Sequence, residues 1–245
     1  MEQEAIYNAG RFDRAKVDLT KPPRNVEEYM RQVIVSRERC EDIAVAKETV
    51  TVIKTPTIVI PQHEEAVCSF APSREWVQSK VENFTHMREV FNERRDKCTN
   101  KLSIQLPGQN DANKWVEFCL SQRCPDIKIS PTSEARFSHH KGTPPTLHFM
   151  LPLPDRFVNS LILHLVKYYI ENGHSQALSE WIFALLVAVR KPLLHDVVSQ
   201  LRDFTRYLKT KRAELTEEDD ELTREYTMFI SIITIYFGQK DLADK

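Results

Sequence analysis

Residues 181–189, WIFALLVAV, form an unbroken run of nine apolar residues and decide the fold. A helix that is apolar on every side must be surrounded by other elements on most of its surface. The flanking sequence supplies such elements, because apolar residues at helical spacing predict helices over 157–169, 175–189, 193–209 and 222–237. Short connections join them, as is typical of antiparallel neighbours. The run therefore predicts the centre of an all-α bundle.

Local signals predict where these helices begin and end. Ser175 is a typical capping residue for the helix that contains the apolar run, and Pro192 disfavours helical geometry at Lys191. The acidic run at 217–221 precedes the last helix, where negative charge interacts favourably with the helix dipole.

Two further helices are predicted upstream of the apolar run. Residues 73–97 keep their large apolar side chains at a period of 3.6 residues. A shorter helix is expected over 111–121, with Asp111 as its cap and Trp115 on its apolar face. Residues 124–154 contain six of the thirteen prolines, so we predict a loop there that is partly disordered.

An extended arm is predicted over 25–72, after a flexible tail over 1–24 and before the helical domain over 73–245. The arm contains one amphipathic helix, for which Asn25 and Glu28 have the spacing of a capping box. A helix of about fifteen residues is marginal alone in water. We therefore expect it to dock on its own domain or on a partner.

Two short runs in the arm are rich in β-forming residues, at 49–53 and 57–60. Pro56 and Pro61 bracket the second run, and prolines at such positions are compatible with an edge strand only. No other strong strand pattern is present to pair with them. The runs are therefore either extended coil or strands that add to the sheet of a partner.

The composition argues against a partner that is held by charge or by a bilayer. Lys and Arg number 34 against 35 Asp and Glu, a net charge of −1, so no global field attracts nucleic acid. The longest apolar run has nine residues, whereas a membrane span needs about 20. Five cysteines, an odd number, are typical of reduced thiols in the cytosol or nucleus. We expect no sequence-specific nucleic-acid binding and no membrane partner.

No motif in the sequence predicts catalysis. The patterns GxSxG, GxxxxGK[ST], HExxH and GxGxxG are all absent. His139 and His140, taken with Cys119 and Cys124, do not have the spacing of a known structural zinc site. We therefore expect no catalytic residue, cofactor or metal, and interpret the chain as a binding protein. Cysteine or histidine chemistry within 119–140 is the enzymatic alternative, which predicts turnover or bound metal.

Four segments, in order along the chain, resemble the survival-motor-neuron (SMN)-interacting protein family, which includes the second Gemin. Residues 22–31, PPRNVEEYMR, are similar to that family's PPRTPEEYLRRV. Residues 181–194 are similar to its RWLYALL…EKPLL segment, and residues 236–244, YFGQKDLAD, to its YFDQRDLAD end. Residues 76–84 and residues 115–120, WVEFCL, fit the middle. Where the family has a basic residue before the Trp of its RW pair, this chain has Glu180.

The resemblance implies a non-enzymatic subunit of the SMN complex, which assembles spliceosomal small nuclear ribonucleoproteins for mRNA splicing. Its implied partners are the SMN protein, other SMN-complex subunits and a pentamer of the Sm proteins D1, D2, E, F and G. The implied activity is that of a scaffold and chaperone that holds the pentamer and limits premature RNA binding. The implied location is the cytoplasm and nucleus, including Gemini and Cajal bodies.

The two protein partners are assigned to different parts of the chain. We expect a helix of SMN to bind the helical domain near Trp181, Phe183 and Leu185, although these side chains also fit a plain hydrophobic core. The alternative function is that of an unrelated α-helical adaptor that binds partner helices. The arm residues expected to bind Sm proteins are Val26, Tyr29, Met30, Arg31, Val33 and Ile34.

Overall fold

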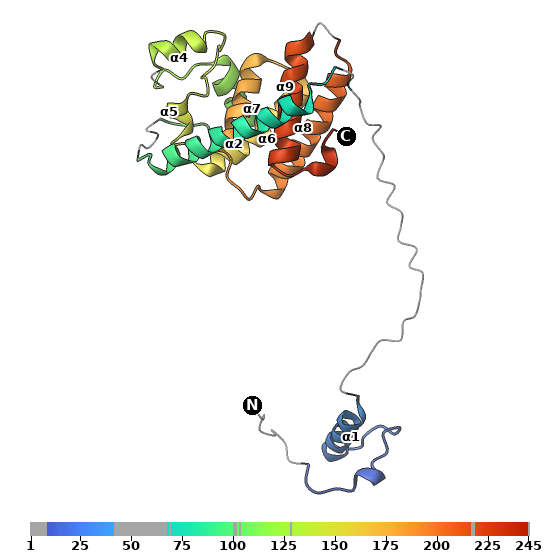
Figure 1. The fold of residues 1–245 in the computed structure, drawn as a ribbon. Helices are drawn as coiled ribbons and strands as arrows, with labels where there is room; N and C mark the ends of the chain where they lie inside the picture. The colour runs from blue at the N-terminus through green and yellow to red at the C-terminus, as the bar shows by residue number, and fades with distance from the viewer. Residues whose placement is uncertain are drawn as a thin grey trace. The chain divides into compact units, whose positions relative to one another are not determined.

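The structure is a computed structural model that describes residues 9–41, 68, 70–99, 102, 104–127, 129–216 and 219–244. The chain divides into two compact units, Met1–Gln62 and His63–Lys245. Within the described ranges every regular element is helical (Figure 1), which confirms the all-α prediction. The two strand-like runs at 49–53 and 57–60 lie outside the described residues. None of the described helices has the length and apolar character needed to cross a membrane.

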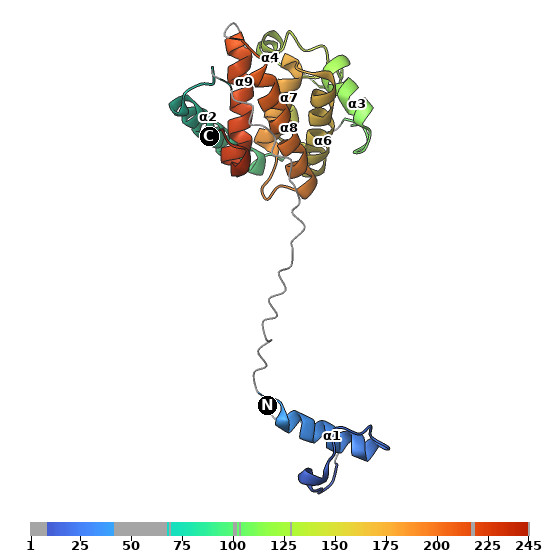
Figure 2. The ribbon, with the colours of Figure 1, turned by 90° about the vertical axis from the view of Figure 1, so that its right-hand side faces the viewer.

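Helix α7 (Gln176–Ala188) is the central element of the larger unit and contains most of the apolar run. Its Trp181, Leu185 and Leu186 are completely buried. Helices α2 (Arg74–Asp96) and α6 (Asp155–Asn172) pack against it. Helix α8 (His195–Ala213) contacts α6 and also contacts α9 (Asp220–Ser231). Figures 1 and 2 show these helices packed side by side in one bundle.

The helix boundaries agree closely with the sequence-based predictions. Ser175 caps α7, since its hydroxyl oxygen accepts a hydrogen bond of 3.3 Å from the Leu178 N–H. Helix α6 starts two residues earlier than predicted and α8 runs four residues further. The predicted last helix is divided into α9 and one π-helical turn, η4 (Ile232–Tyr236). After it, a short 3-10 turn, η5 (Lys240–Leu242), ends the regular structure.

The helix predicted over 111–121 is present as α3 (Ala112–Val116) followed by the π-helical turn η2 (Glu117–Ser121). Trp115 is fully buried, as its place on the predicted apolar face requires, and Cys119 of η2 is fully buried as well. The Trp115 indole N–H donates to the Gly108 carbonyl at 2.9 Å. Figure 2 places α3 at the outer side of α6, and the two helices are in contact.

The loop predicted over 124–154 needs correction. It contains two short helices, α4 (Pro131–Arg136) and α5 (Leu147–Met150), and its centre packs into the bundle. The Thr143 carbonyl accepts a hydrogen bond of 2.9 Å from the Trp181 indole N–H. The backbone N–H of Thr143 donates to the Phe118 carbonyl at 2.9 Å. Gly142 makes this approach possible, because a Cβ there would lie 2.4 Å from the Cys119 backbone. The prolines predict an irregular backbone over this segment. They do not predict its hydrogen bonds to Phe118 and Trp181, which are far away in the sequence.

A buried arginine stabilises the end of α7. Arg88 of α2 donates hydrogen bonds to the carbonyl oxygens of Leu186 and Val189. The last carbonyls of a helix have no partner within the helix, so these bonds satisfy groups that would otherwise be buried unpaired. The guanidinium also lies over the rings of Tyr236 and Phe237, at 5.2 and 5.4 Å from their centroids. Arg88 therefore connects α2, α7 and the C-terminal region.

A second buried arginine, Arg212 of α8, binds the C-terminal segment. It donates to the two carboxylate oxygens of Asp244 at 2.7 and 2.9 Å, and to the Thr227 hydroxyl at 3.0 Å. Burial raises the pKa of Asp244, but the contacts with Arg212 and Lys209 outweigh burial, and the pKa lies below its ordinary value. The Asp244 carboxylate is therefore the counter-ion that makes a buried guanidinium tolerable.

The smaller unit is built around α1 (Val26–Arg39), which starts where the sequence predicts. The Asn25 side-chain oxygen accepts from the Glu28 N–H at 2.8 Å. Glu28 in return accepts from the Arg24 N–H at 2.8 Å, one residue upstream of the partner in a capping box. These two hydrogen bonds stabilise the first turn of the helix.

Residues before α1 contact one side of this helix. Gln32 donates from its side-chain amide to the carbonyls of Asp18 and Lys21, at 2.8 and 2.9 Å. Arg14 forms an ion pair of 2.8 Å with Glu38. The flexibility predicted for residues 1–24 is untested. Within this segment, the described Arg14, Asp18 and Lys21 contact α1.

We predict that Asp244→Asn destabilises the protein by about 3–5 kcal/mol at pH 7, because it leaves the Arg212 charge buried without a counter-ion. The matched control is Asp241→Asn, which removes the carboxylate that pairs with the more exposed Arg202 and should cost less than about 1 kcal/mol. Urea unfolding monitored by circular dichroism measures both.

The Asp244 effect has a defined pH dependence. A carboxyl whose pKa is lowered on folding contributes stability above the unfolded value of about 3.9, and that contribution is lost as the pH falls through the lowered value. The difference between the wild type and Asp244→Asn should therefore shrink below about pH 4. Equal losses for Asp244→Asn and Asp241→Asn at pH 7 would contradict the assignment.

Candidate binding surfaces

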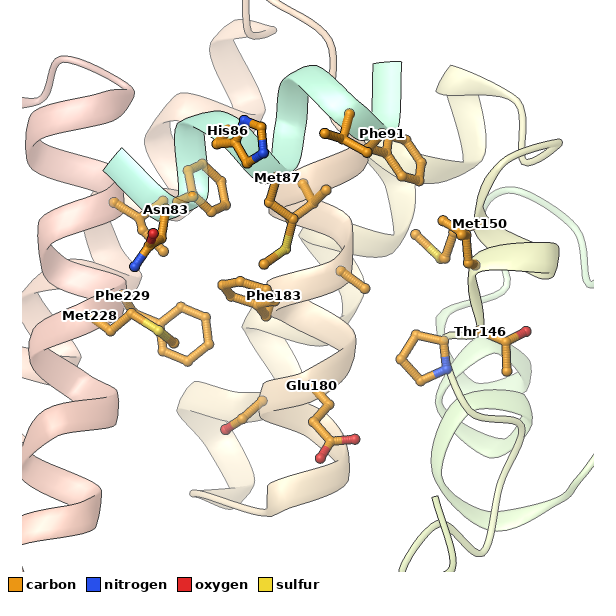
Figure 3. A pocket seen from close by; sticks show the side chains of 18 of the residues that line it. Asn83, His86, Met87, Phe91, Thr146, Met150, Glu180, Phe183, Met228 and Phe229 are labelled. Atoms are coloured by element: carbon orange, nitrogen blue, oxygen red, sulfur yellow. The ribbon is translucent and has the colours of Figure 1, made fainter. Parts of the chain in front are cut away.

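An open groove of about 1100 Å³ lies on the larger unit. Helices α2, α7 and α9 and the segment 133–150 contribute its lining. Figure 3 shows Met87 of α2, Phe183 of α7 and Met228 of α9 pointing toward one another across it, with Met150 on the opposite wall. Elements that are far apart in the sequence therefore form one concave surface.

The groove is largely apolar and contains three methionines. Met87 is 45% exposed, which is unusual for a large apolar side chain, and Phe183 is half-buried. Methionine side chains are flexible and polarizable, and adapt to irregular partner surfaces. A concave surface with exposed apolar side chains is a candidate interaction site.

Charged residues of both signs also line the groove. Lys80 and Arg94 come from α2 and Arg136 from α4, whereas Glu180 and Glu225 come from α7 and α9. Figure 3 shows Glu180 near the start of α7, a full turn from Phe183 along the helix axis. The lining therefore combines an apolar centre with charged groups that can select a partner.

The three residues predicted for SMN binding do not lie together on this surface. Trp181 and Leu185 are completely buried in the core, so only Phe183 reaches the groove. The residues of α7 that line it are 179, 180, 183, 184 and 187, a spacing that places them on one side of a helix. Because the sequence run is apolar throughout, it does not show which side of α7 faces the groove. The polar Glu180, about one turn before Phe183, was the signal that could have identified that side.

Methionines 87, 150 and 228 are the groove residues that sequence reasoning missed. Each belongs to an element that periodicity treats as an ordinary amphipathic helix or as a loop. These three side chains lie together because α2 packs against both α7 and α9 and because the segment 133–150 forms another wall of the groove, which no local pattern encodes.

The arm residues predicted for Sm binding lie on α1 and are partly open. Tyr29 is 54% exposed, and Val26 and Val33 are exposed with it, whereas Met30, Arg31 and Ile34 are half-buried. Positions 26, 29, 30 and 33 share one side of the helix. The tail contacts made by Gln32 and Glu38 leave this apolar side uncovered.

Arg31 has a different environment from the apolar residues of α1. Its guanidinium forms a 3.3 Å ion pair with Glu27 and lies 5.7 Å from the centroid of the Phe12 ring. It therefore connects the helix to the segment that precedes it.

The described cysteines and histidines show two further chemical features. Burial raises the pKa of the Cys119 thiol well above its ordinary value, which keeps it protonated and unreactive. His139, His140 and Glu180 bring three potential metal-ligating atoms within 4.8 Å of one another. Glu180 also lines the groove, so this cluster borders the candidate binding surface.

Comparison with known proteins identifies consistent relatives. The family model described as "Survival motor neuron (SMN) interacting protein 1 (SIP1)" matches residues 15–240. The chain is 28% identical over 241 residues to Gem-associated protein 2 of Xenopus laevis, covering 93% of this chain and 92% of that protein. It is 26% identical over 238 residues to Gem-associated protein 2 of Mus musculus, covering 93% and 88%.

A solved structure shares the fold. A chain of the structure described as "The 8S snRNP Assembly Intermediate" aligns with a TM-score of 0.64 and 22% sequence identity. The alignment covers 89% of this chain and 98% of the other.

Proposed function

The chain belongs to the survival motor neuron (SMN) interacting protein 1 family, and from this membership we propose that it is a non-enzymatic scaffold and chaperone of the SMN complex. In this role it binds a helix of SMN and a pentamer of the Sm proteins D1, D2, E, F and G. It holds the pentamer and limits premature RNA binding during spliceosomal ribonucleoprotein assembly. The observation that carries the proposal is the family match over 15–240, because that range includes both α1 and the helical bundle.

Other features of the proposal follow from the same role. Other SMN-complex subunits are further partners, and the protein acts in the cytoplasm and nucleus, including Gemini and Cajal bodies. The arm over 25–72 and the helical domain over 73–245 are the two functional parts.

The groove is the proposed site for the SMN helix. A helix that lies in a groove presents apolar side chains at intervals of three and four residues, and these need an apolar floor. Phe183 and the surrounding methionines supply such a floor. Glu180 and Glu225 are negatively charged, so the partner helix should carry a basic or neutral side chain where it meets them.

We predict that Met87→Glu weakens binding of an SMN helix peptide about tenfold or more, because a charge would be buried against apolar side chains. Met87 is exposed in the free protein, so the folded state should be little affected. The control is Ser79→Glu, which adds the same charge to an exposed position of α2 outside the groove. Isothermal titration calorimetry measures both. Equal dissociation constants for the two variants would contradict the proposed site.

The arm is the proposed second contact with the Sm pentamer. Half-burying five apolar side chains of α1 gains roughly 4–7 kcal/mol gross, and ordering and association cost a comparable amount. The arm alone should therefore bind weakly. A connector over 40–72 can span on the order of 100 Å when extended. Once one contact has formed, the linker holds the second binding part near the pentamer at an effective concentration of about the mM range. The two weak contacts together therefore give a large gain in avidity.

We predict that cutting the chain near residue 62 abolishes tight binding of the pentamer, while each fragment still binds weakly. The cut falls between the two compact units, so it leaves each unit intact. The expected loss is about 100-fold or more, because the two contacts no longer share an effective concentration. Titration of the purified pentamer with the intact chain and with each fragment measures it. A C-terminal fragment that binds as tightly as the intact chain would refute the two-site mechanism.

We predict that Tyr29→Ala and Arg31→Glu each weaken pentamer binding by the intact chain about fivefold or more, as expected for central interface residues. Arg37→Glu makes the same charge change at an exposed position in the last turn of α1 and should have less effect. If Arg37→Glu and Arg31→Glu are equivalent, the contact is non-specific electrostatics and not the proposed surface.

A further inference from the structure

Two histidines from one segment and one carboxylate from the central helix form a compact cluster. His139 and His140 follow α4, whereas Glu180 lies in the first turns of α7, about 40 residues away along the chain. The Nε2 atom of His140 lies 2.8 Å from Oε2 of Glu180, and Nε2 of His139 lies 3.1 Å from Oε1. The two imidazole rings are 4.6 Å apart between centroids.

The two histidine–carboxylate distances lie near the separation of neighbouring ligands in a tetrahedral zinc site, with each histidine against a different oxygen of Glu180. The three ligand atoms together lie within 4.8 Å of one another. Zinc binds imidazole nitrogen and carboxylate oxygen at about 2.0–2.2 Å, which places two ligands of a tetrahedron about 3.3 Å apart. The nitrogen–oxygen distances of 2.8 and 3.1 Å are slightly shorter than this value. A small outward rotation of the side chains would make room for the ion.

The cluster is fixed on one side and accessible on the other. The His140 side chain is completely buried, whereas His139 and Glu180 are 28% and 32% exposed. The His140 ring packs edge-on against Phe137, with centroids 5.3 Å apart. One ligand is therefore fixed by its surroundings. The two others are partly exposed, and Glu180 lines the groove, which gives an ion a path of entry and leaves space for a fourth ligand.

The kinds of donor atom in the cluster suit zinc. Two imidazoles and one carboxylate form a donor set that zinc prefers, whereas magnesium and calcium prefer oxygen ligands alone.

We propose that His139, His140 and Glu180 bind one zinc ion beside the groove, with water or a partner side chain as the fourth ligand. The second ring nitrogen of His140, Nδ1, is buried without a hydrogen-bond partner among the described residues. A hydrogen-bond partner on the second nitrogen of a ligating histidine typically contributes 10–100-fold to metal affinity. We therefore expect weaker zinc binding here than at a site that has such a partner.

The test is a titration of the full-length, reduced protein with Co²⁺ and Zn²⁺, with no SMN or Sm protein present. We expect one equivalent of Co²⁺ to bind with the visible absorption of a tetrahedral nitrogen–oxygen site and to be displaced by Zn²⁺. Intense near-ultraviolet absorption would indicate thiolate ligands, and would overturn the assignment by placing the metal on the cysteines. Absence of saturable binding would overturn it as well.

Two variants and one matched control assign the ligands. Glu180→Gln keeps the shape of the side chain, and His139→Ala alters a partly exposed one, so both variants should fold, which circular dichroism verifies. Each should weaken Zn²⁺ binding tenfold or more. His174→Ala removes a different histidine–glutamate pair, 3.2 Å from Glu225, and should leave Zn²⁺ binding unchanged. If folded Glu180→Gln binds Zn²⁺ like the wild type, the proposal is wrong. This result is independent of the proposed function, because it involves no protein partner.

Discussion

The burial of α7 is the constraint on which the rest of the larger unit depends. A nine-residue apolar run has no side that water can solvate without cost, so every neighbour of α7 gains by covering it. Helices α2 and α6 cover two sides, and the Thr143 carbonyl satisfies the one polar group of Trp181. Burial of each large side chain contributes about 1.5–3 kcal/mol. This gain explains why an irregular, proline-rich segment is held against the helix.

The coverage of α7 is incomplete, and the uncovered side is the groove. The side of the helix marked by Glu180, Phe183 and Ala184 lies between α2, α9 and the segment that ends at α5. A partner helix placed there would complete the burial that the bundle leaves unfinished. The proposed binding surface is thus a consequence of the core itself and not a separate feature added to the fold.

Buried charges fix how the bundle ends. Arg88 binds the last carbonyls of α7, and Arg212 binds the carboxylate of Asp244. Removing one partner of such a contact costs far more than the pair contributes when intact, because the remaining group stays buried and unpaired. These contacts therefore specify where α2 and the C-terminal segment pack, in addition to any stability they provide.

The sequence by itself determined the local structure. The all-α class, the capping of α7 by Ser175 and the capping of α1 by Asn25 depend on residues within a few positions of each other, and periodicity reads those directly. The family was also evident from four short segments, and its match extends over 15–240.

Tertiary structure alone decided which residues form the sites. In a run that is apolar throughout, no pattern separates the buried Trp181 from the groove-lining Phe183, since the difference lies in what covers each side. The pairing of Thr143 with Trp181, and of His140 with Glu180, joins residues 38 and 40 positions apart. Such contacts depend on the packing of whole helices, which is set by the sum of many weak burial terms and not by any local signal.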